Sequence, residues 1–460
     1  MENKKIRMEW GTVAVIWALA WPTMLEQLMQ TAVQYIDTAM VGSLGTQATA
    51  AVGSTTTVNW LISSSVSALS IGFLAFIAKA CGAKDKESAS RAVGQAVLVT
   101  LVVGLFFTAV TLGLSSKVPV WMQVDRDIQS IAARYFFILY MPMLPRTASI
   151  IFGTVLRAAG DTRTPMKVGV AVNIINVVLN FLLIYPTRQL TLFGISFIMP
   201  GAGWGVIGAA VASAAAFAVG GIYITVVLWK HPMVSPKGQS IAPDMHILRP
   251  CLKVALPNML QRFGTSFGFV AFASMINSVG EIATAAHTIA NTVESAFYIP
   301  GFGMQTAAAT LTGNAYGAKD KDNMRSITRM FIVIEVVLMT LSGAALFFTA
   351  EPLVNIFSDS TEVISLGTTV LKMVALSEPL YGVALIVEGF MMGVGRTRIP
   401  FVYNIIGMWG VRILGTFIFT QFLGGGLVAA WGCMIAHNVL LCCLYFADYV
   451  KGRWNPLNNI

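Results

Sequence analysis

Four polar side chains stand inside otherwise apolar stretches of the sequence: Asp37, Asn176, Asn180 and Ser213. A polar or charged group in such a stretch is costly to bury, so each one requires a structural or chemical reason. Asn176 and Asn180 are four residues apart, so they share a face if their segment is helical. A carboxylate, two amides and a hydroxyl supply hard oxygen ligands, which suit a small hard cation. We therefore predict a cation site with Asp37 as its charged member and with Na⁺ or a proton as the ion. The alternative is that these groups only join neighbouring helices.

The second half of the sequence carries a different set of charged side chains in apolar runs: Arg262, Glu294, Glu378, Glu388 and Arg412. All of these except Glu388 fall near the middle of their runs. Opposite charges at one depth should pair, because pairing lowers the cost of burying them. Glu294 lies six residues before a proline, close to a possible helix break. It is the best candidate here to bind a proton or a cationic ligand, with an ion pair to Arg262 or Arg412 as the alternative; Glu378 and Arg262 are further candidates for ligand contact.

Glu26 shares its apolar run with Asp37 and precedes it by eleven residues. Eleven residues are close to three helical turns, so the two acids would lie on roughly one face, about 16 Å apart. Two roles remain open for Glu26, a structural one and one in contact with a ligand. We treat it as a further candidate for ligand contact.

The elements that must position these side chains are membrane-spanning helices. The chain has 460 residues, of which 56% are hydrophobic and only 11% charged, whereas a soluble domain has about 25% charged residues. Apolar runs of the roughly 20 residues that cross a bilayer recur along its whole length. We predict an all-α polytopic membrane protein with twelve spans, at residues 12–42, 48–80, 91–116, 127–156, 165–187, 203–229, 251–279, 283–315, 326–350, 362–394, 399–424 and 426–447.

The net charge of +9 is explained by topology. The lysines and arginines fall mostly in the segments that would lie on one side of the membrane, together with both termini. The positive-inside rule then places both termini in the cytoplasm, in a multi-pass protein of the cell (inner) membrane. We therefore expect the lipid bilayer as a partner and no nucleic acid. The protein is expected to be monomeric.

An internal repeat recurs at an offset of 235 residues. The segment Gly82–Lys86 reads Gly-Ala-Lys-Asp-Lys, and so does Gly317–Lys321; Pro22 matches Pro257 in the same register. Each half would hold six helices, so the halves would run parallel and be related by a pseudo-two-fold axis around a central cavity. This organisation predicts an N-terminal lobe (1–229), a cytoplasmic linker (230–250) and a C-terminal lobe (251–460).

Five segments carry a resemblance to a known family: Pro22–Leu28, Tyr35–Gly42, Leu156–Pro165, His287–Asn291 and Ile299–Gly303. Together they resemble the MATE (multidrug and toxic compound extrusion) family over essentially the whole chain. The resemblance implies an antiporter that expels organic, often cationic, compounds in exchange for Na⁺ or H⁺ by alternating access. Such a protein is not an enzyme, has no catalytic residues, and has small organic molecules as its substrates.

The resemblance also bears on the site. Archaeal members have a first-lobe cation and proton site whose positions match Asp37, Asn176 and Ser213, but they carry a second Asp where this chain has Asn180. The acid that other members carry in their seventh span is absent, because the two positions concerned are Thr265 and Gln261. This favours coupling in the first lobe and the DinF-like branch over the NorM-like one.

The energy source is expected to be an ion gradient, since the sequence has no Walker A motif for ATP. No bound cofactor is expected, and Na⁺ or H⁺ would act as the coupling ion. The alternative function is a flippase or exporter of a lipid or lipid-linked molecule. Arg146, Arg262 and Arg412, three cationic residues within apolar runs, are the observation on which that alternative rests.

Overall fold

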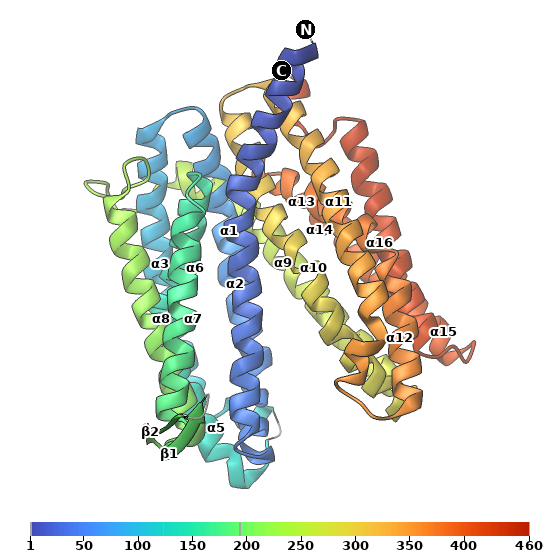
Figure 1. The fold of residues 1–460 in the computed structure, drawn as a ribbon. Helices are drawn as coiled ribbons and strands as arrows, with labels where there is room; N and C mark the ends of the chain where they lie inside the picture. Colours follow the sequence, from blue (N-terminus) through green and yellow to red (C-terminus); the bar gives the residue numbers. More distant parts are fainter. Residues whose placement is uncertain (1, 123, 193–194, 460) are drawn as a thin grey trace. The chain divides into compact units, whose positions relative to one another are not determined.

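The computed structural model describes residues 2–122, 124–192 and 195–459. Figure 1 shows long helices joined by short connections, with a single β-hairpin among the described residues. The elements of the first half are α1 (Glu2–Gly42), α2 (Thr46–Gly82), α3 (Lys86–Leu114), α4 (Val118–Trp121), α5 (Arg126–Tyr140), α6 (Met143–Ala158), α7 (Arg163–Leu183), β1 (Pro186–Leu192), β2 (Ile195–Ala202) and α8 (Gly205–Lys230). Those of the second half are α9 (Met245–Asn277), α10 (Glu281–Gly317), α11 (Lys321–Asn355), α12 (Thr361–Ala375), α13 (Glu378–Gly393), α14 (Arg398–Ile405), η1 (Ile406–Ile413), α15 (Leu414–Gln421), α16 (Leu427–Val450) and η2 (Pro456–Asn459).

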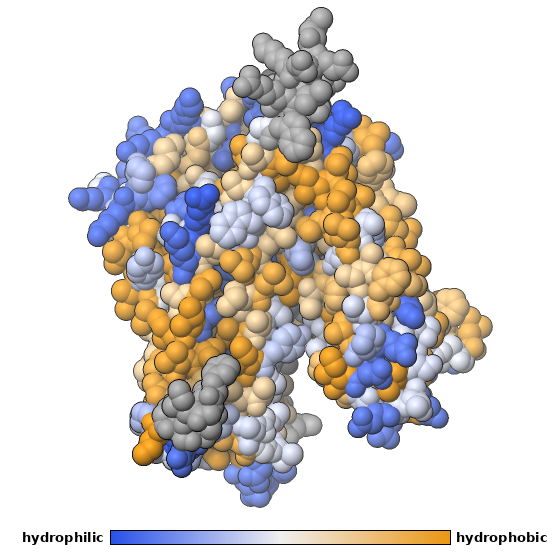
Figure 2. Space-filling view, viewed as in Figure 1, coloured by the Kyte–Doolittle hydropathy of each residue, from blue (hydrophilic) through white to orange (hydrophobic). Residues whose placement is uncertain are grey.

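Eight helices in the described part of the chain are long and apolar enough to cross a membrane. The number rises to ten when α5 with α6 and α12 with α13 each count as one span, bent by 49° and 52°. Helices α9 and α10 have 33 and 37 residues and carry several of the polar side chains considered above. On the face drawn in Figure 2, hydrophobic residues extend along the helices and hydrophilic ones gather at their ends. The membrane character is therefore confirmed, and the count of twelve stays a prediction.

The chain folds into two compact units. One consists of residues 1–28, 74–85 and 250–460, and the other of residues 29–73 and 86–249. We call them the C unit and the N unit. The boundary near residue 250 coincides with the predicted linker, whereas the first part of α1 and the last part of α2 belong to the C unit. The division into lobes at 1–229 and 251–460 stays a prediction.

The internal repeat is visible in the backbone. Lys84 and Lys319 are the two non-glycine residues with positive φ in the described chain, both at 56°, and they occupy the same place in the duplicated Gly-Ala-Lys-Asp-Lys segment. Gly160 (φ 89°) and Gly395 (φ 76°) are another such pair at the same offset. A left-handed residue costs strain unless it is glycine, so its recurrence at matching positions indicates that the two turns share one backbone conformation.

A reciprocal contact joins the ends of α2 and α10 within the C unit. A Cβ added to Gly82 would lie 1.9 Å from the backbone oxygen of Asn314, and one added to Gly317 would lie 1.8 Å from that of Lys79. The offset that relates Gly82 to Gly317 also relates Lys79 to Asn314. The two helices therefore cross at backbone distance, and each glycine leaves room for the main chain of the other helix.

Glycines also bring α8 close to its neighbours in the N unit. Gly208 lies against the backbone of Leu183 at the end of α7, and Gly221 against the backbone of Pro145 in α6. Added Cβ atoms would come within 2.4 and 2.1 Å of carbonyl oxygens there. Such small residues allow membrane helices to approach closely, and this approach fixes Ser213 of α8 beside α7.

Two local features depart from a plain helical bundle. The residues between the predicted spans 165–187 and 203–229 build an antiparallel β-hairpin of β1 and β2, in which Pro186 pairs with Ala202. Threonine and isoleucine favour extended backbone there. In the C unit the helix from Arg398 to Gln421 contains the π-helical segment η1. Such segments are rare and often mark functional positions; this one carries Arg412.

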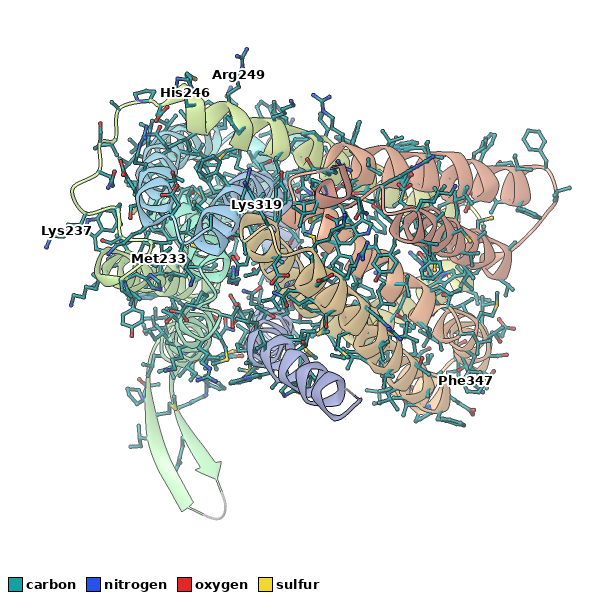
Figure 3. The ribbon with its side chains drawn as sticks, turned by 90° about the horizontal axis from the view of Figure 1, so that it is seen from above. Met233, Lys237, His246, Arg249, Lys319 and Phe347 are labelled. Atoms are coloured by element: carbon teal, nitrogen blue, oxygen red, sulfur yellow. The ribbon has the colours of Figure 1, made fainter. Side chains whose placement is uncertain are left out.

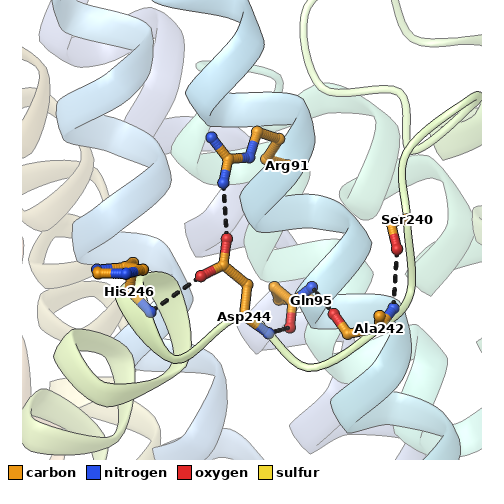
Figure 4. A network of polar contacts seen from close by, with 6 residues as sticks. All are labelled: Arg91, Gln95, Ser240, Ala242, Asp244 and His246. Carbon is orange, nitrogen blue, oxygen red and sulfur yellow. Dashed lines mark hydrogen bonds and ion pairs between the residues drawn. The ribbon is translucent and has the colours of Figure 1, made fainter.

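The linker after α8 is fastened to α3 inside the N unit. Asp244 Oδ2 accepts from Arg91 Nη2 at 2.7 Å, and the buried Gln95 bonds both the carbonyl of Ala242 and the N–H of Asp244, at 2.8 and 2.9 Å (Figure 4). Figure 3 follows this segment from Met233 past Lys237. The linker therefore has a fixed path.

Candidate cation site

The four side chains predicted to form the cation site lie together in the N unit. Asp37 comes from α1, Asn176 and Asn180 from α7, and Ser213 from α8. Asn180 Nδ2 donates to Asp37 Oδ1 at 2.5 Å and lies 3.1 Å from Asn176 Oδ1. The Asn176 amide contacts Ser213 Oγ at 3.0 Å. Both asparagines are buried, whereas Asp37 and Ser213 are half-buried, so the carboxylate has neutral amides on its inner side.

The amide of Asn176 has two orientations, which differ in the atom that faces the Asp37 carboxyl group. In one, its oxygen faces Asp37 and its nitrogen donates to Ser213. After a half-turn, the nitrogen donates to the two carboxylate oxygens of Asp37 at 2.8 and 3.2 Å, and the oxygen accepts from Ser213 Oγ at 3.0 Å. The second orientation satisfies a bare carboxylate. The first places two oxygen atoms 2.8 Å apart, which requires a proton or a cation between them.

A further oxygen atom on one of these residues has no hydrogen-bond partner. The Oδ1 atom of buried Asn180 makes no hydrogen bond among the described residues. Buried polar atoms are nearly always bonded, so this atom is a candidate ligand for an ion. No group of three or more His, Cys, Asp or Glu side chains that could hold a metal occurs in the described part of the chain. The donor set, one carboxylate with neutral oxygens, therefore fits Na⁺ or a proton.

A buried arginine lies in the same unit, and the sequence did not place it in the site. Arg146 of α6 donates through Nη2 to Asn59 Oδ1 at 2.7 Å and to Ser63 Oγ at 2.9 Å, both on α2. Its guanidinium lies 4.6 Å from the ring centre of Phe217. It forms no direct ion pair with a carboxylate in the described part of the N unit. Its charge is held by α2 oxygens and an aromatic face, which agrees with the cost of leaving a buried guanidinium unbonded.

The predicted pairing of opposite charges in the second half gives no direct ion pair in the described chain, although Arg412 lies within electrostatic range of Glu294 and Arg262 within that of Glu388. Arg262 Nε donates to Asn258 Oδ1 at 3.1 Å, one turn earlier in α9. Arg412 packs over the rings of Phe269 and Phe272, 4.9 and 4.1 Å from their centres. Within the described chain, neither of these two arginines forms a direct ion pair with an acid. The direction in which a side chain leaves its helix decides its direct partners, and the position in the sequence does not give that direction.

The acids of the second half lie in the C unit, and Glu378 is near enough to Glu294 for their charges to interact. Glu388 of α13 accepts from Gln261 Nε2 of α9 at 2.7 Å. Glu294 of α10 and Glu378, the first residue of α13, are both buried, and Glu378 Oε2 has no hydrogen-bond partner among the described residues. Glu26 of α1 is buried in this unit as well. These four acids therefore do not share the Asp37 site, and each remains only a candidate for substrate contact.

Comparison with known proteins decides the family. The family model named MatE matches residues 22–182 and again residues 257–418. The chain belongs to the MATE family. The two matches start at Pro22 and Pro257, the pair that the internal repeat aligns, so the duplication found in the sequence is a property of the family domain.

Relatives and solved structures agree with this membership. The chain is 27% identical to the probable multidrug resistance protein NorM of Thermotoga maritima, over 95% of this chain and 92% of the relative. It is 24% identical to the probable multidrug resistance protein YoeA of Bacillus subtilis, over 94% and 92%. The fold is shared with the crystal structure of MATE in complex with MaL6, with TM-score 0.88, 22% identity and 97% of each chain covered. It is also shared with a MOP superfamily transporter from Pyrococcus furiosus, with TM-score 0.87, 23% identity and 96% of each chain covered.

One buried acid of this MATE protein was missed by the sequence reasoning. Glu335 of α11 has no exposed surface, and neither of its carboxyl oxygens has a partner among the described residues. The signal was present, because Glu335 is the one acid within the apolar run 326–350. We considered groups of polar residues at equal depth and therefore did not single out Glu335, which stands alone in its run.

Proposed function

We propose that this MATE family member is a secondary active antiporter that exports organic, cationic, drug-like compounds in exchange for Na⁺ or H⁺. The observation that carries the proposal is the lone carboxylate of Asp37, held by two buried amides of α7 between apolar helices. The names of the relatives NorM and YoeA, multidrug resistance proteins, support a drug-like substrate. Those names do not favour the alternative of a lipid exporter.

The proposed coupling step uses the two orientations of Asn176. When it is protonated, Asp37 donates a hydrogen bond to Asn176 Oδ1. A bound Na⁺ would be shared by the Asp37 carboxylate and oxygens of Asn176, Asn180 and Ser213. After the ion leaves, the Asn176 amide turns and donates to the bare carboxylate. The Ser213 hydroxyl serves both orientations, because it can donate or accept.

Ion occupancy can change the conformation only if the two states bind the ion with different affinity. The Asp37 site joins α1, α7 and α8, so a change in its hydrogen bonds alters how these three helices pack. We propose that this difference drives alternating access. The arrangement we propose for it is twelve spans in two parallel six-helix bundles around a central cavity, acting as a monomer.

The orientation in the membrane is also part of the proposal. Both termini would lie in the cytoplasm and the protein in the inner (cell) membrane, because the basic residues gather on one side. We further propose coupling of the DinF-like kind. The position that other members fill with a seventh-span acid is Gln261, whose amide donates to Glu388. Several relatives carry the name NorM, so the branch is a question for experiment.

The test is substrate efflux from proteoliposomes under an imposed ion gradient. Asp37→Asn keeps the shape of the side chain and removes its charge, so gradient-driven efflux should fall to the level seen without a gradient while the protein stays folded and inserted. Glu294→Gln should retain coupling and change the substrate range or lower the rate in part. Near-normal gradient-driven efflux by Asp37→Asn would move the coupling site to the C unit.

The coupling ion is tested by replacing Na⁺ with choline at a fixed pH gradient. If Na⁺ is the ion, efflux stops, and Ser213→Ala should raise the Na⁺ concentration needed for half-maximal rate, since a neutral ligand is lost. If efflux is unchanged in choline, the proton is the ion and the amides only adjust the charge state of Asp37. ATP in gradient-free vesicles should support no efflux.

A further inference from the structure

The carboxyl group of Glu335 is buried in the C unit and has no hydrogen-bond partner among the described residues. Its helix, α11, runs from Lys321 to Asn355, and the side chain has 0% exposure. Neither Oε1 nor Oε2 has a hydrogen-bond partner in the described chain. Phe331, four residues earlier on α11, and Met339, four residues later, are fully buried apolar neighbours. The acid therefore stands on an apolar face of its own helix.

Two glycines on neighbouring helices form a notch around this group. A Cβ added to Gly301 of α10 would lie 2.9 Å from Glu335 Oε1, and one added to Gly382 of α13 would lie 3.1 Å from both Oε1 and Cγ. The distance at Gly301 is shorter than real Cβ contacts and the one at Gly382 is tighter than most of them, so a larger residue at either position would press on the carboxyl group and force it to shift. Leu385 of α13 and Met339 complete the wall at Gly301. The notch accommodates a carboxyl group, and none of the described residues donates a hydrogen bond to it.

No charge compensates Glu335 from the helices packed against α11. The titratable groups on these helices are Glu281, His287, Glu294, Tyr298 and Tyr316 on α10, Glu362 and Lys372 on α12, and Glu378, Tyr381 and Glu388 on α13. None of them bonds to Glu335. The cation among them, Lys372, lies over the ring of Phe347, 5.6 Å from its centre. An isolated ionised carboxylate in such surroundings is far more costly than a neutral acid.

We propose that Glu335 is a proton-binding site of this protein, separate from Asp37, and that the packing of α10, α11 and α13 seen here accepts it only as the neutral acid. Loss of the proton leaves a charge that the notch cannot hold, so the carboxylate must reach water through a different packing of these helices. Proton binding therefore favours the present arrangement of the C unit. The proposal does not depend on which ion Asp37 binds.

Infrared spectroscopy of the full chain in liposomes tests the charge state directly. A protonated carboxyl group has a carbonyl-stretch band that is separate from the bands of carboxylates and amides and shifts in D₂O. At neutral pH the Glu335→Gln variant should lose one such band relative to the unchanged chain. The matched control is Glu362→Gln, an exposed acid on α12, which should leave the band unchanged. An unchanged band in Glu335→Gln would overturn the proposal.

The same comparison is made in the Asp37→Asn background, so that failure of the proposed coupling site and failure of this site are told apart. Loss of the band on adding Glu335→Gln there supports Glu335 whatever Asp37 does. If Glu335→Gln does not fold, Glu335→Met is used, because methionine fills the notch with an apolar group of similar size. Thermal unfolding adds an independent measurement. Raising the pH should destabilise the unchanged chain more than the Met or Gln variant, and parallel curves would overturn the proposal.

Discussion

The close crossing of α2 and α10 predicts how much an added methyl group at this crossing would destabilise the protein. In Gly82→Ala the new methyl group would start 1.9 Å from the carbonyl oxygen of Asn314, and in Gly317→Ala it would start 1.8 Å from that of Lys79. Ordinary contact begins at 3.4 Å. The helices must therefore separate, and overpacking of this kind destabilises a protein by about 1–3 kcal/mol. We expect each variant to lower the free energy of unfolding by that amount.

The assay is reversible unfolding of the purified protein in mixed micelles with increasing SDS. Gly113→Ala is the matched control, because an added Cβ there meets nothing within 4 Å and alanine favours helix by up to about 1 kcal/mol. The double variant Gly82→Ala/Gly317→Ala should cost less than the sum of the single variants, since both act on one crossing. Single variants as stable as the unchanged chain, or strictly additive effects, would refute the reasoning.

Three further predictions concern the N unit. Asn180→Asp places a second carboxylate beside Asp37, so we expect Na⁺ to raise the melting temperature of this variant more than it raises that of the unchanged chain. Equal shifts in the two proteins would show that Na⁺ does not bind there. At the linker, Gln95→Leu should lower the free energy of unfolding by about 1–3 kcal/mol, because it leaves backbone groups unpaired, whereas Asp244→Asn should lower it little. Limited proteolysis of the linker compares the two variants. Equal rates of cleavage would contradict this ranking. The hydrogen bond from the His246 backbone holds the pKa of Asp244 below its usual range, so any loss of linker protection should appear only in acid and should be as small as the loss caused by Asp244→Asn.

Much of the architecture could be predicted from the sequence because its causes act along the chain. Hydropathy depends on composition within about 20 residues, and it indicated the membrane helices. The repeat at 235 residues is a property of residue order, and the matching turns at Lys84 and Lys319 follow from it. The Asp37 site was also within reach. Asn176 and Asn180 share a face by spacing, and Asp37 and Ser213 are polar groups that stand inside apolar stretches.

What the sequence could not decide depends on the direction in which side chains leave their helices and on how closely helices approach. Arg262 and Arg412 have acids within electrostatic range, yet their direct contacts are to a residue of the same helix or to aromatic rings, because a direct ion pair also requires the right side-chain direction. The surroundings of Glu335 are made by Gly301 and Gly382, which belong to other helices. Backbone contact at a glycine arises only when two distant segments meet, so the notch, and with it the chemistry of that acid, is a property of the tertiary structure.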